Sequence, residues 1–247
     1  MSCRIFRCGF FVFALKRSLA IFPSWFYSLI IFLFSTVCTA RIDLGFLIDA
    51  TSTVLRPGSH EYQKLIDFIR ETARRFKISR QATRIAVVTY ALRTKQIISF
   101  ARSYTLSRVY SALRGMQVLG GRRRLGSALY SVKQNLFAAK PLCGQRRVLI
   151  VVNGGESVDR VRKPAQTLEG AGVEIFVVGV GGVGRRTVSQ LVTDRAHLFM
   201  VRFARLNTII KTLKDRICYS PGRTCEQRTI YLVETNILQS LDASLSN

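Results

Sequence analysis

The chain of 247 residues is long enough for one domain of ordinary size with extensions at its ends. It carries 38 Lys and Arg against 14 Asp and Glu, a formal net charge of +24. This excess of cations favours an acidic partner, namely a sulfated glycosaminoglycan, anionic lipid or nucleic acid, and the sequence contains no nucleic-acid-binding module.

The first 40 residues have the parts of a secretion signal. An uncharged stretch over 18–40 ends in small residues, and four bases without an acid precede it: Arg4, Arg7, Lys16 and Arg17. We expect cleavage after Ala40, which leaves 34 Lys and Arg against 14 Asp and Glu, a net charge of +20. An uncleaved signal anchor is the alternative, because the uncharged stretch could also cross a bilayer of about 30 Å. Both interpretations place the remainder in the lumen or outside the cell.

From Arg41 on, short apolar runs alternate with amphipathic segments, a pattern typical of an α/β sheet covered by helices. Several runs have consecutive branched or aromatic residues, as strands buried on both faces do. The predicted strands are Ile42 to Ile48, Arg84 to Ala91, Gln96 to Phe100, Val148 to Val152, Val173 to Val178 and His197 to Val201.

The first predicted helix is marked by an apolar stripe at helical spacing. The stripe consists of Tyr62, Leu65, Ile66, Ile69, Ala73 and Phe76. The other predicted helices are Thr105 to Arg114, Leu125 to Ala138, Arg160 to Glu169, Arg186 to Thr193 and Leu206 to Ile217.

A tail over 219–247 follows, which we expect to be mostly unstructured. Three cysteines remain after the predicted leader: Cys143, Cys218 and Cys225. An oxidising compartment favours one disulfide and one cysteine left over, either free or bridging to a second chain. The sequence does not choose among the pairings. No Asn-x-Ser/Thr acceptor occurs, so we expect no N-glycosylation.

Two buried strands run into polar loops, over 42–53 and 146–157. In the first loop Asp49, Thr51 and Thr53 occupy alternate positions, which turns the ends of their side chains towards one point above the sheet. Carboxylate and hydroxyl oxygens in this arrangement are suited to a hard cation such as Mg²⁺.

These stretches resemble the von Willebrand factor type A domain, closest to its matrilin-like extracellular matrix group. The segments over 77–91 and 171–181 are similar to the family's lead into its second strand and to its fifth strand. The resemblance extends over about 41–218. It implies a Rossmann-like α/β fold with a mostly parallel sheet, one antiparallel edge strand and helices on both faces, and a non-catalytic adhesion role.

The resemblance also implies a metal-ion-dependent adhesion site. In the family, Asp-x-Ser-x-Ser on the first loop, a Thr on a second loop and an Asp after the fourth strand hold Mg²⁺. Here Arg123 stands where that Thr belongs, and Gly154 stands where that Asp belongs. A guanidinium cannot ligate a metal ion and repels it. We therefore predict that the remnant site of Asp49, Thr51 and Thr53 holds no Mg²⁺ or binds it only very weakly, and we expect no other cofactor.

Two hypotheses follow for the loop of three arginines over 122–124. In one, Arg123, helped by Arg122 or Arg124, binds a carboxylate or sulfate of the partner directly. In the other, the site is inactive and the loop is a solvated turn. Further basic clusters recur near element ends, and several on one face would form a groove for a polyanion: Arg74-Arg75-Phe76-Lys77, Arg146-Arg147, Arg160-Val161-Arg162-Lys163 and Arg185-Arg186.

Catalytic interpretations have little support. The run over 179–184 fits Gly-x-Gly-x-x-Gly but lacks the later acidic residue that would hold a ribose. His60 and His197 have no nucleophile and acid partner by motif. We expect a secreted, non-enzymatic module that binds collagens, other matrix proteins or sulfated glycans. A membrane-anchored receptor-like ectodomain is the alternative.

Overall fold

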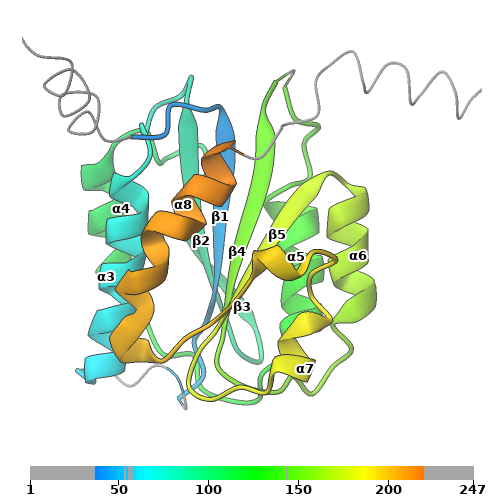
Figure 1. Ribbon diagram of the computed structural model, residues 1–247. Coiled ribbons are helices and arrows are strands. Elements are labelled where there is room, and N and C mark those ends of the chain that lie inside the picture. Colours follow the sequence, from blue (N-terminus) through cyan, green and yellow to red (C-terminus); the bar gives the residue numbers. More distant parts are fainter. Residues whose placement is uncertain (1–36, 53, 55–57, 143, 220–247) are drawn as a thin grey trace, which may run out of the picture. The chain divides into compact units, whose positions relative to one another are not determined.

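The computed structural model describes residues 37–52, 54, 58–142 and 144–219. Its centre is a six-stranded sheet in the order β3-β2-β1-β4-β5-β6, in which only β3 runs antiparallel to its neighbour. The strands are β1 (Ile42–Asp49), β2 (Thr83–Tyr90), β3 (Thr94–Ile98), β4 (Arg146–Asn153), β5 (Val173–Gly179) and β6 (Leu198–Met200). The predicted α/β fold with one antiparallel edge strand is confirmed (Figure 1).

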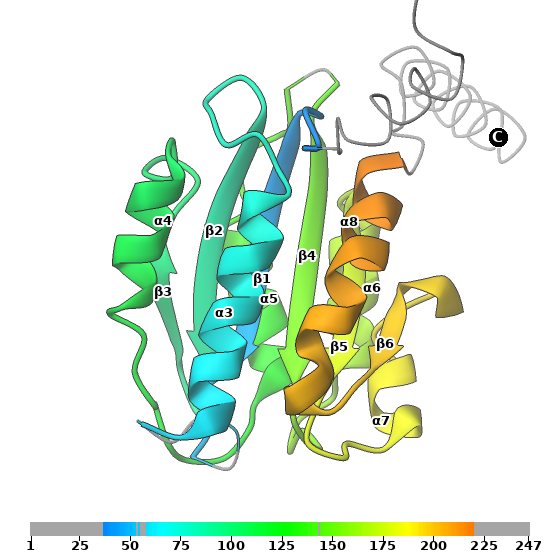
Figure 2. The ribbon, with the colours of Figure 1, turned by 60° about the vertical axis from the view of Figure 1, so that its left-hand side comes forward.

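Helices cover both faces of this sheet. One face packs against α3 (His60–Arg74), α4 (Leu106–Leu113) and α8 (Ile210–Tyr219). The other packs against α5 (Leu125–Asn135), α6 (Arg162–Gly170) and α7 (Arg185–Ser189). Figure 2 shows α3 and α8 in front of the sheet and α6 behind it. Two 3₁₀ segments, η1 (Arg195–His197) and η2 (Phe203–Ile209), flank β6.

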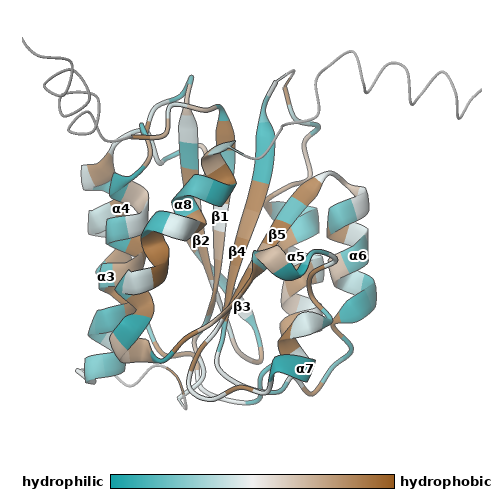
Figure 3. Ribbon diagram, viewed as in Figure 1, coloured by the Kyte–Doolittle hydropathy of each residue, from teal (hydrophilic) through white to brown (hydrophobic). Residues whose placement is uncertain are grey.

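Strand β1 shows why the central strands lack polar alternation. All eight of its residues are buried, because alternate side chains enter the two cores. Phe46 and Ile48 pack towards α3 and α8, whereas Leu47 packs towards α5. The largely apolar β4 and β5 behave in the same way (Figure 3). Parallel pairing brings the carboxyl ends of β1, β2 and β4 to one edge of the sheet.

Helix α3 follows the predicted stripe. Ser59 accepts a hydrogen bond from the Tyr62 backbone N–H at 3.2 Å, which satisfies one of the free amides of the first turn. Leu65 and Ile69 are fully buried. Phe76 is also buried but lies after the helix, which ends at Arg74.

Some predicted element ends differ from the structure. Helix α5 ends at Asn135 rather than Ala138, because the chain turns there to bury Phe137 against Phe100, with ring centroids 5.5 Å apart. The predicted helix from Leu206 begins as the 3₁₀ segment η2 and becomes α-helical only at Ile210. No helix among the described residues is long and apolar enough to cross a membrane.

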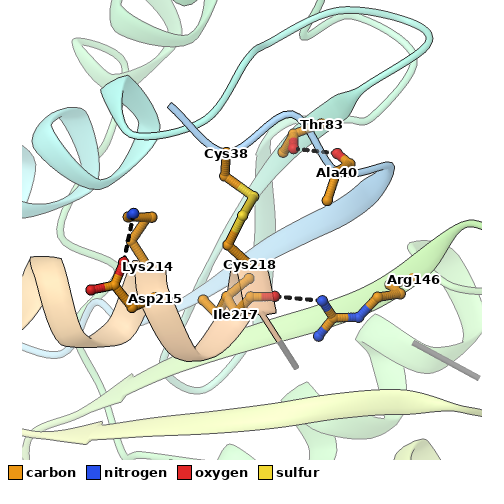
Figure 4. Close-up of a disulfide and its surroundings, with 8 residues drawn as sticks. All are labelled: Cys38, Ala40, Thr83, Arg146, Lys214, Asp215, Ile217 and Cys218. Carbon is orange, nitrogen blue, oxygen red and sulfur yellow. Dashed lines mark hydrogen bonds and ion pairs between the residues drawn. A yellow bond between two sulfur atoms is a disulfide. The ribbon is translucent and has the colours of Figure 1, made fainter. Parts of the chain in front are cut away.

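A disulfide joins the two ends of the described domain. Cys38 pairs with Cys218 at the end of α8, with a Cα–Cα distance of 5.8 Å (Figure 4). The sequence-based candidates for a disulfide were Cys143, Cys218 and Cys225, without a choice of pairing, and Cys38 was placed in the leader, so the partner of Cys218 was missed. Cys143 and Cys225 lie outside the described residues, as do the predicted signal segment up to residue 36 and the predicted tail from residue 220.

The segment around Cys38 is part of the folded domain because its backbone is paired with the end of α3. The Cys38 N–H donates to the Arg75 carbonyl and the Lys77 N–H donates to the Cys38 carbonyl, both at 2.8 Å. The Ala40 carbonyl accepts from the Thr83 hydroxyl at 3.1 Å. The folded domain therefore includes Cys38, and cleavage after Ala40 would remove one half of the disulfide.

Candidate functional site

The candidate site lies at the carboxyl edge of the sheet, where β1 and β4 end. Asp49, the last residue of β1, is fully buried. Its carboxylate accepts from the Thr51 N–H at 3.1 Å, the Thr51 hydroxyl at 2.8 Å and the Gly154 N–H at 3.1 Å. Three donors thus hold a negative charge inside the protein.

The Arg123 guanidinium completes the surroundings of Asp49. Its Nε–H donates to Asp49 Oδ2, its Nη2–H donates to the Thr51 hydroxyl at 2.8 Å, and its Nη1–H donates to the Glu156 carbonyl at 3.3 Å. The Arg123 side chain is only 12% exposed. A fixed positive charge therefore lies against the buried carboxylate and the threonine, with its donors directed inward.

Two glycines after β4 make room for this arrangement. A Cβ at Gly155 would lie 2.5 Å from Arg123 Nη1, so a side chain there would displace the guanidinium. A Cβ at Gly154 would lie 2.2 Å from Cγ2 of the buried Val54. A carboxylate at position 154 therefore requires Val54 to move.

The loop that carries Arg123 is hydrogen-bonded to the segment after β2 and to the loop after β4. Gly120 and Gly121 adopt positive φ angles of 66° and 76°, a conformation that favours glycine. The Arg124 N–H donates to the Ala91 carbonyl, and the Val158 N–H donates to the Arg123 carbonyl, both at 3.0 Å. These hydrogen bonds fix the backbone of Arg123 and Arg124 before any partner binds.

Asp159 and Ser157 anchor the same loop by capping α5 from outside the helix. Asp159 accepts from the backbone N–H groups of Gly126 and Ser127 at 2.8 Å and from the Ser127 hydroxyl at 2.7 Å. The Ser157 hydroxyl donates to Asp159 at 2.6 Å and accepts from the Leu125 N–H at 2.9 Å. Helix α5 has no side-chain cap from its own N-cap residue, so this loop supplies it.

Replacing Asp159 with asparagine is expected to destabilise the domain by about 1 kcal/mol at neutral pH through loss of the cap. Burial alone would raise the pKa of Asp159, but the hydrogen bonds from Ser157, Ser127 and Gly126 outweigh it and lower the pKa below 3.8. A lowered folded-state pKa gives stability that is present above 3.8 and is lost as the pH falls through the folded-state value.

Urea unfolding of both proteins as a function of pH tests this expectation. The difference between the natural protein and the Asp159→Asn variant should be constant at neutral pH and shrink as the pH falls below 3.8. A difference that persists unchanged in acid would show that the charge of Asp159 does not act on the cap.

A buried tyrosine supports the site from below. The Tyr90 hydroxyl donates to Asn153 Oδ1 at 2.8 Å, and Asn153 Nδ2 donates to the Gly155 carbonyl at 2.8 Å. Burial, followed by the nearby Asp49 carboxylate, raises the pKa of Tyr90 well above its ordinary value. Tyr90 therefore stays neutral and fixes the loop that carries the two glycines.

The structure brings together Asp49, Thr51, Arg123 and Gly154, four of the residues predicted for the site. Thr53 lies outside the described residues. Arg122 and Arg124 are exposed on the same loop, and the hydrogen bonds described for Asp49 and Thr51 do not involve them. Sequence reasoning missed the supporting residues Tyr90, Asn153, Glu156, Ser157 and Asp159. For Glu156, Ser157 and Asp159, the only signal in the sequence was their position in the polar run between β4 and α6.

Comparison with known proteins identifies relatives in sequence and in structure. The family model described as "von Willebrand factor type A domain" matches residues 43–214. Cochlin of Cavia porcellus is 27% identical over 187 residues, which cover 74% of this chain and 34% of the relative. Vitrin of Bos taurus is 28% identical over 188 residues, which cover 74% of this chain and 28% of the relative. The collagen alpha-5(VI) chain of Homo sapiens is 28% identical over 180 residues, which cover 72% of this chain and 7% of the relative.

The chain thus spans about a third or less of the length of these relatives. Among solved structures, proximal thread matrix protein 1 of the mussel byssus matches with a TM-score of 0.69 at 21% identity. That match covers 74% of this chain and 50% of the mussel protein. A second structure of the mussel protein, with the same TM-score, is described as having a zinc-occupied MIDAS motif. These matches show a shared fold.

Proposed function

Because this chain belongs to the von Willebrand factor type A domain family, we propose that it is a non-catalytic extracellular matrix binding module that works without a metal ion. The relatives support the matrix role: one is a collagen VI chain, and the mussel protein is named a thread matrix protein. The Cys38–Cys218 disulfide supports an oxidising, extracellular location.

The position of Arg123 carries the proposal of metal independence. Asp49, the carboxylate of the family's first motif, is already bonded to the guanidinium, which also donates to the Thr51 hydroxyl. Gly154 offers no second carboxylate. A divalent ion at this place would meet one occupied carboxylate, one occupied hydroxyl and a fixed positive charge. The residues present do not fit a metal ion, and Arg123 supplies in its place the charge that Asp49 requires.

Calorimetric titration with Mg²⁺ and Mn²⁺ tests this proposal. We expect no heat of binding for the natural protein. A variant with Arg123→Thr and Gly154→Asp restores the family's donors, and Val54→Ala is added because the new side chain at 154 would otherwise collide with Val54. We expect this triple variant to bind Mg²⁺.

The matched control is Val54→Ala alone, which changes the packing and leaves Arg123 in place. It should bind no metal. Saturable Mg²⁺ binding by the natural protein, or loss of its matrix binding in EDTA, would contradict metal independence.

The second candidate is a membrane-anchored ectodomain, and the disulfide supports this candidate. The expected cleavage after Ala40 would remove Cys38, which is bonded to Cys218. We therefore expect the chain to be either cut before Cys38 or not cut at all. The mass of the N-terminal peptide of protein expressed in eukaryotic cells separates the two, because only the anchored form retains residues 18–36 and remains in the membrane fraction.

A further inference from the structure

A groove lies beside the Arg123 site, between the loop that follows β4 and helix α7. Its volume is about 630 Å³, within the range of ligand-binding clefts. From Arg160 on, its cationic and neutral polar lining side chains are Arg160, Arg162, Lys163, Gln166, Thr187 and Gln190. All of them except Thr187 are exposed, so a ligand can reach them from solvent. The groove therefore offers both charge and hydrogen-bond donors.

The cations of the groove are not neutralised within the described part of the chain. The ion pairs found there do not include Arg160, Arg162 or Lys163. The Arg146-Arg147 cluster differs: Arg146 pairs with Glu174 at 2.6 Å, and Arg147 is buried. In contrast to that cluster, Arg160, Arg162 and Lys163 combine exposed charge with a cavity.

Two acids also line the groove, and they differ in availability. Asp159 is engaged by the end of α5 and by the Ser157 hydroxyl, so its charge is directed away from a ligand. Glu156 is exposed and remains the one carboxylate that opposes an anion at this place.

The electrostatics at the start of α6 add to the positive potential. Helix α6 begins with Arg162 and Lys163, has no acid in its first turn and has Val161 as an N-cap residue without a side-chain hydrogen bond. A helix N-terminus is itself partly positive, so cations there are unfavourable until an anion lies opposite them. A bound anion would relieve this repulsion.

The Arg123 guanidinium does not bind this anion, because its donors are directed to Asp49, Thr51 and Glu156 within the protein. We propose that the sulfate groups of a sulfated glycosaminoglycan bind in this groove, held by Arg160, Arg162 and Lys163. The proposal rests on the matrix-binding function above and names its partner class and its site. Planar guanidinium groups donate paired hydrogen bonds to sulfate oxygens as they do to phosphate, and the lysine adds a point charge.

Heparin affinity chromatography and titration with a sulfated heparin oligosaccharide test the proposal on the oxidised full-length protein. Changing Arg160, Arg162 and Lys163 together to glutamine should weaken the oligosaccharide Kd about tenfold and lower the salt concentration of elution. Glu156→Gln should act in the opposite direction and tighten binding. Oligosaccharide stripped of its sulfates should not bind.

The matched control removes three exposed cations outside the groove and outside the basic clusters, Arg102, Arg108 and Lys140, in the same way. It has the same net charge as the groove variant and should retain most of the affinity. Equal losses in both variants would overturn the groove and leave a diffuse attraction by net charge. Absence of heparin binding by the natural protein would overturn the glycan partner, whereas collagen binding that survives in the groove variant would leave the matrix-binding function intact.

Discussion

Replacing Arg123 with methionine is expected to lower the free energy of unfolding by about 3–5 kcal/mol, because it leaves the buried charge of Asp49 without its partner. Asp49 is fully buried and Arg123 is 12% exposed, so solvent cannot replace the guanidinium without opening the loop. Methionine fills a similar volume, so most of the loss would come from charge and hydrogen bonds. Urea denaturation at neutral pH measures the change.

A double-mutant cycle separates the ion pair from packing. Asp49→Asn alone leaves Arg123 without its anion, whereas Asp49→Asn with Arg123→Met removes both charges. We expect the double variant to be more stable than the sum of the single losses predicts, with a coupling energy of at least about 1.5 kcal/mol. Arg123→Lys keeps the charge but loses the forked donors and should lie between the natural protein and Arg123→Met.

An Arg123→Met variant that loses less than about 1 kcal/mol would show that the guanidinium does not stabilise Asp49, since exposed ion pairs contribute no more than that. Addition of Mg²⁺ to the Arg123→Thr variant is a further check on the same charge. Partial recovery of its stability would mean that a metal ion and the guanidinium are alternative partners of Asp49.

The sequence predicted the sheet well because its central strands are buried on both faces. Such strands appear as uninterrupted branched and apolar runs, and β1 and β4 lie within two residues of their predicted ends. Less was predicted where tertiary contacts decide the ends of elements. The early end of α5 follows from the burial of Phe137, which no local pattern marks.

The sequence predicted the residues at the centre of the site but not the residues that hold its loops in place. Asp49, Thr51, Arg123 and Gly154 could be expected to meet, because parallel strands end at one edge and the family's motif gives their order. Asp159 could not be assigned, because it caps a helix that begins 34 residues earlier, at Leu125. Long-range caps leave no spacing in the sequence, whereas local caps such as Ser59 do.

The disulfide of Cys38 was missed for a related reason. The position of Cys38 among small residues before Arg41 is typical of a signal-peptide cleavage region, and its partner lies 180 residues later. Only the return of α8 to the amino-terminal edge of the sheet brings Cys218 next to it (Figure 4).

Removing this disulfide is expected to cost about 2–5 kcal/mol, towards the upper end because the bridge closes a long loop and so restricts the unfolded chain strongly. Cys38→Ser, Cys218→Ser and the double variant should be destabilised alike, since each loses the same bond. Urea unfolding with and without dithiothreitol measures this loss. Reduction should lower the stability of the natural protein to that of the variants.

A chain that begins at Arg41 provides the decisive comparison. It lacks Cys38 together with the backbone hydrogen bonds that Cys38 makes to Arg75 and Lys77, so it should be less stable than Cys38→Ser, which retains those bonds. If the chain from Arg41 were as stable as the natural protein, the domain would start where the leader was first expected to end. Cleavage after Ala40 would remove both the backbone hydrogen bonds of Cys38 and its disulfide to Cys218. We therefore expect a secreted form to begin at or before Cys38.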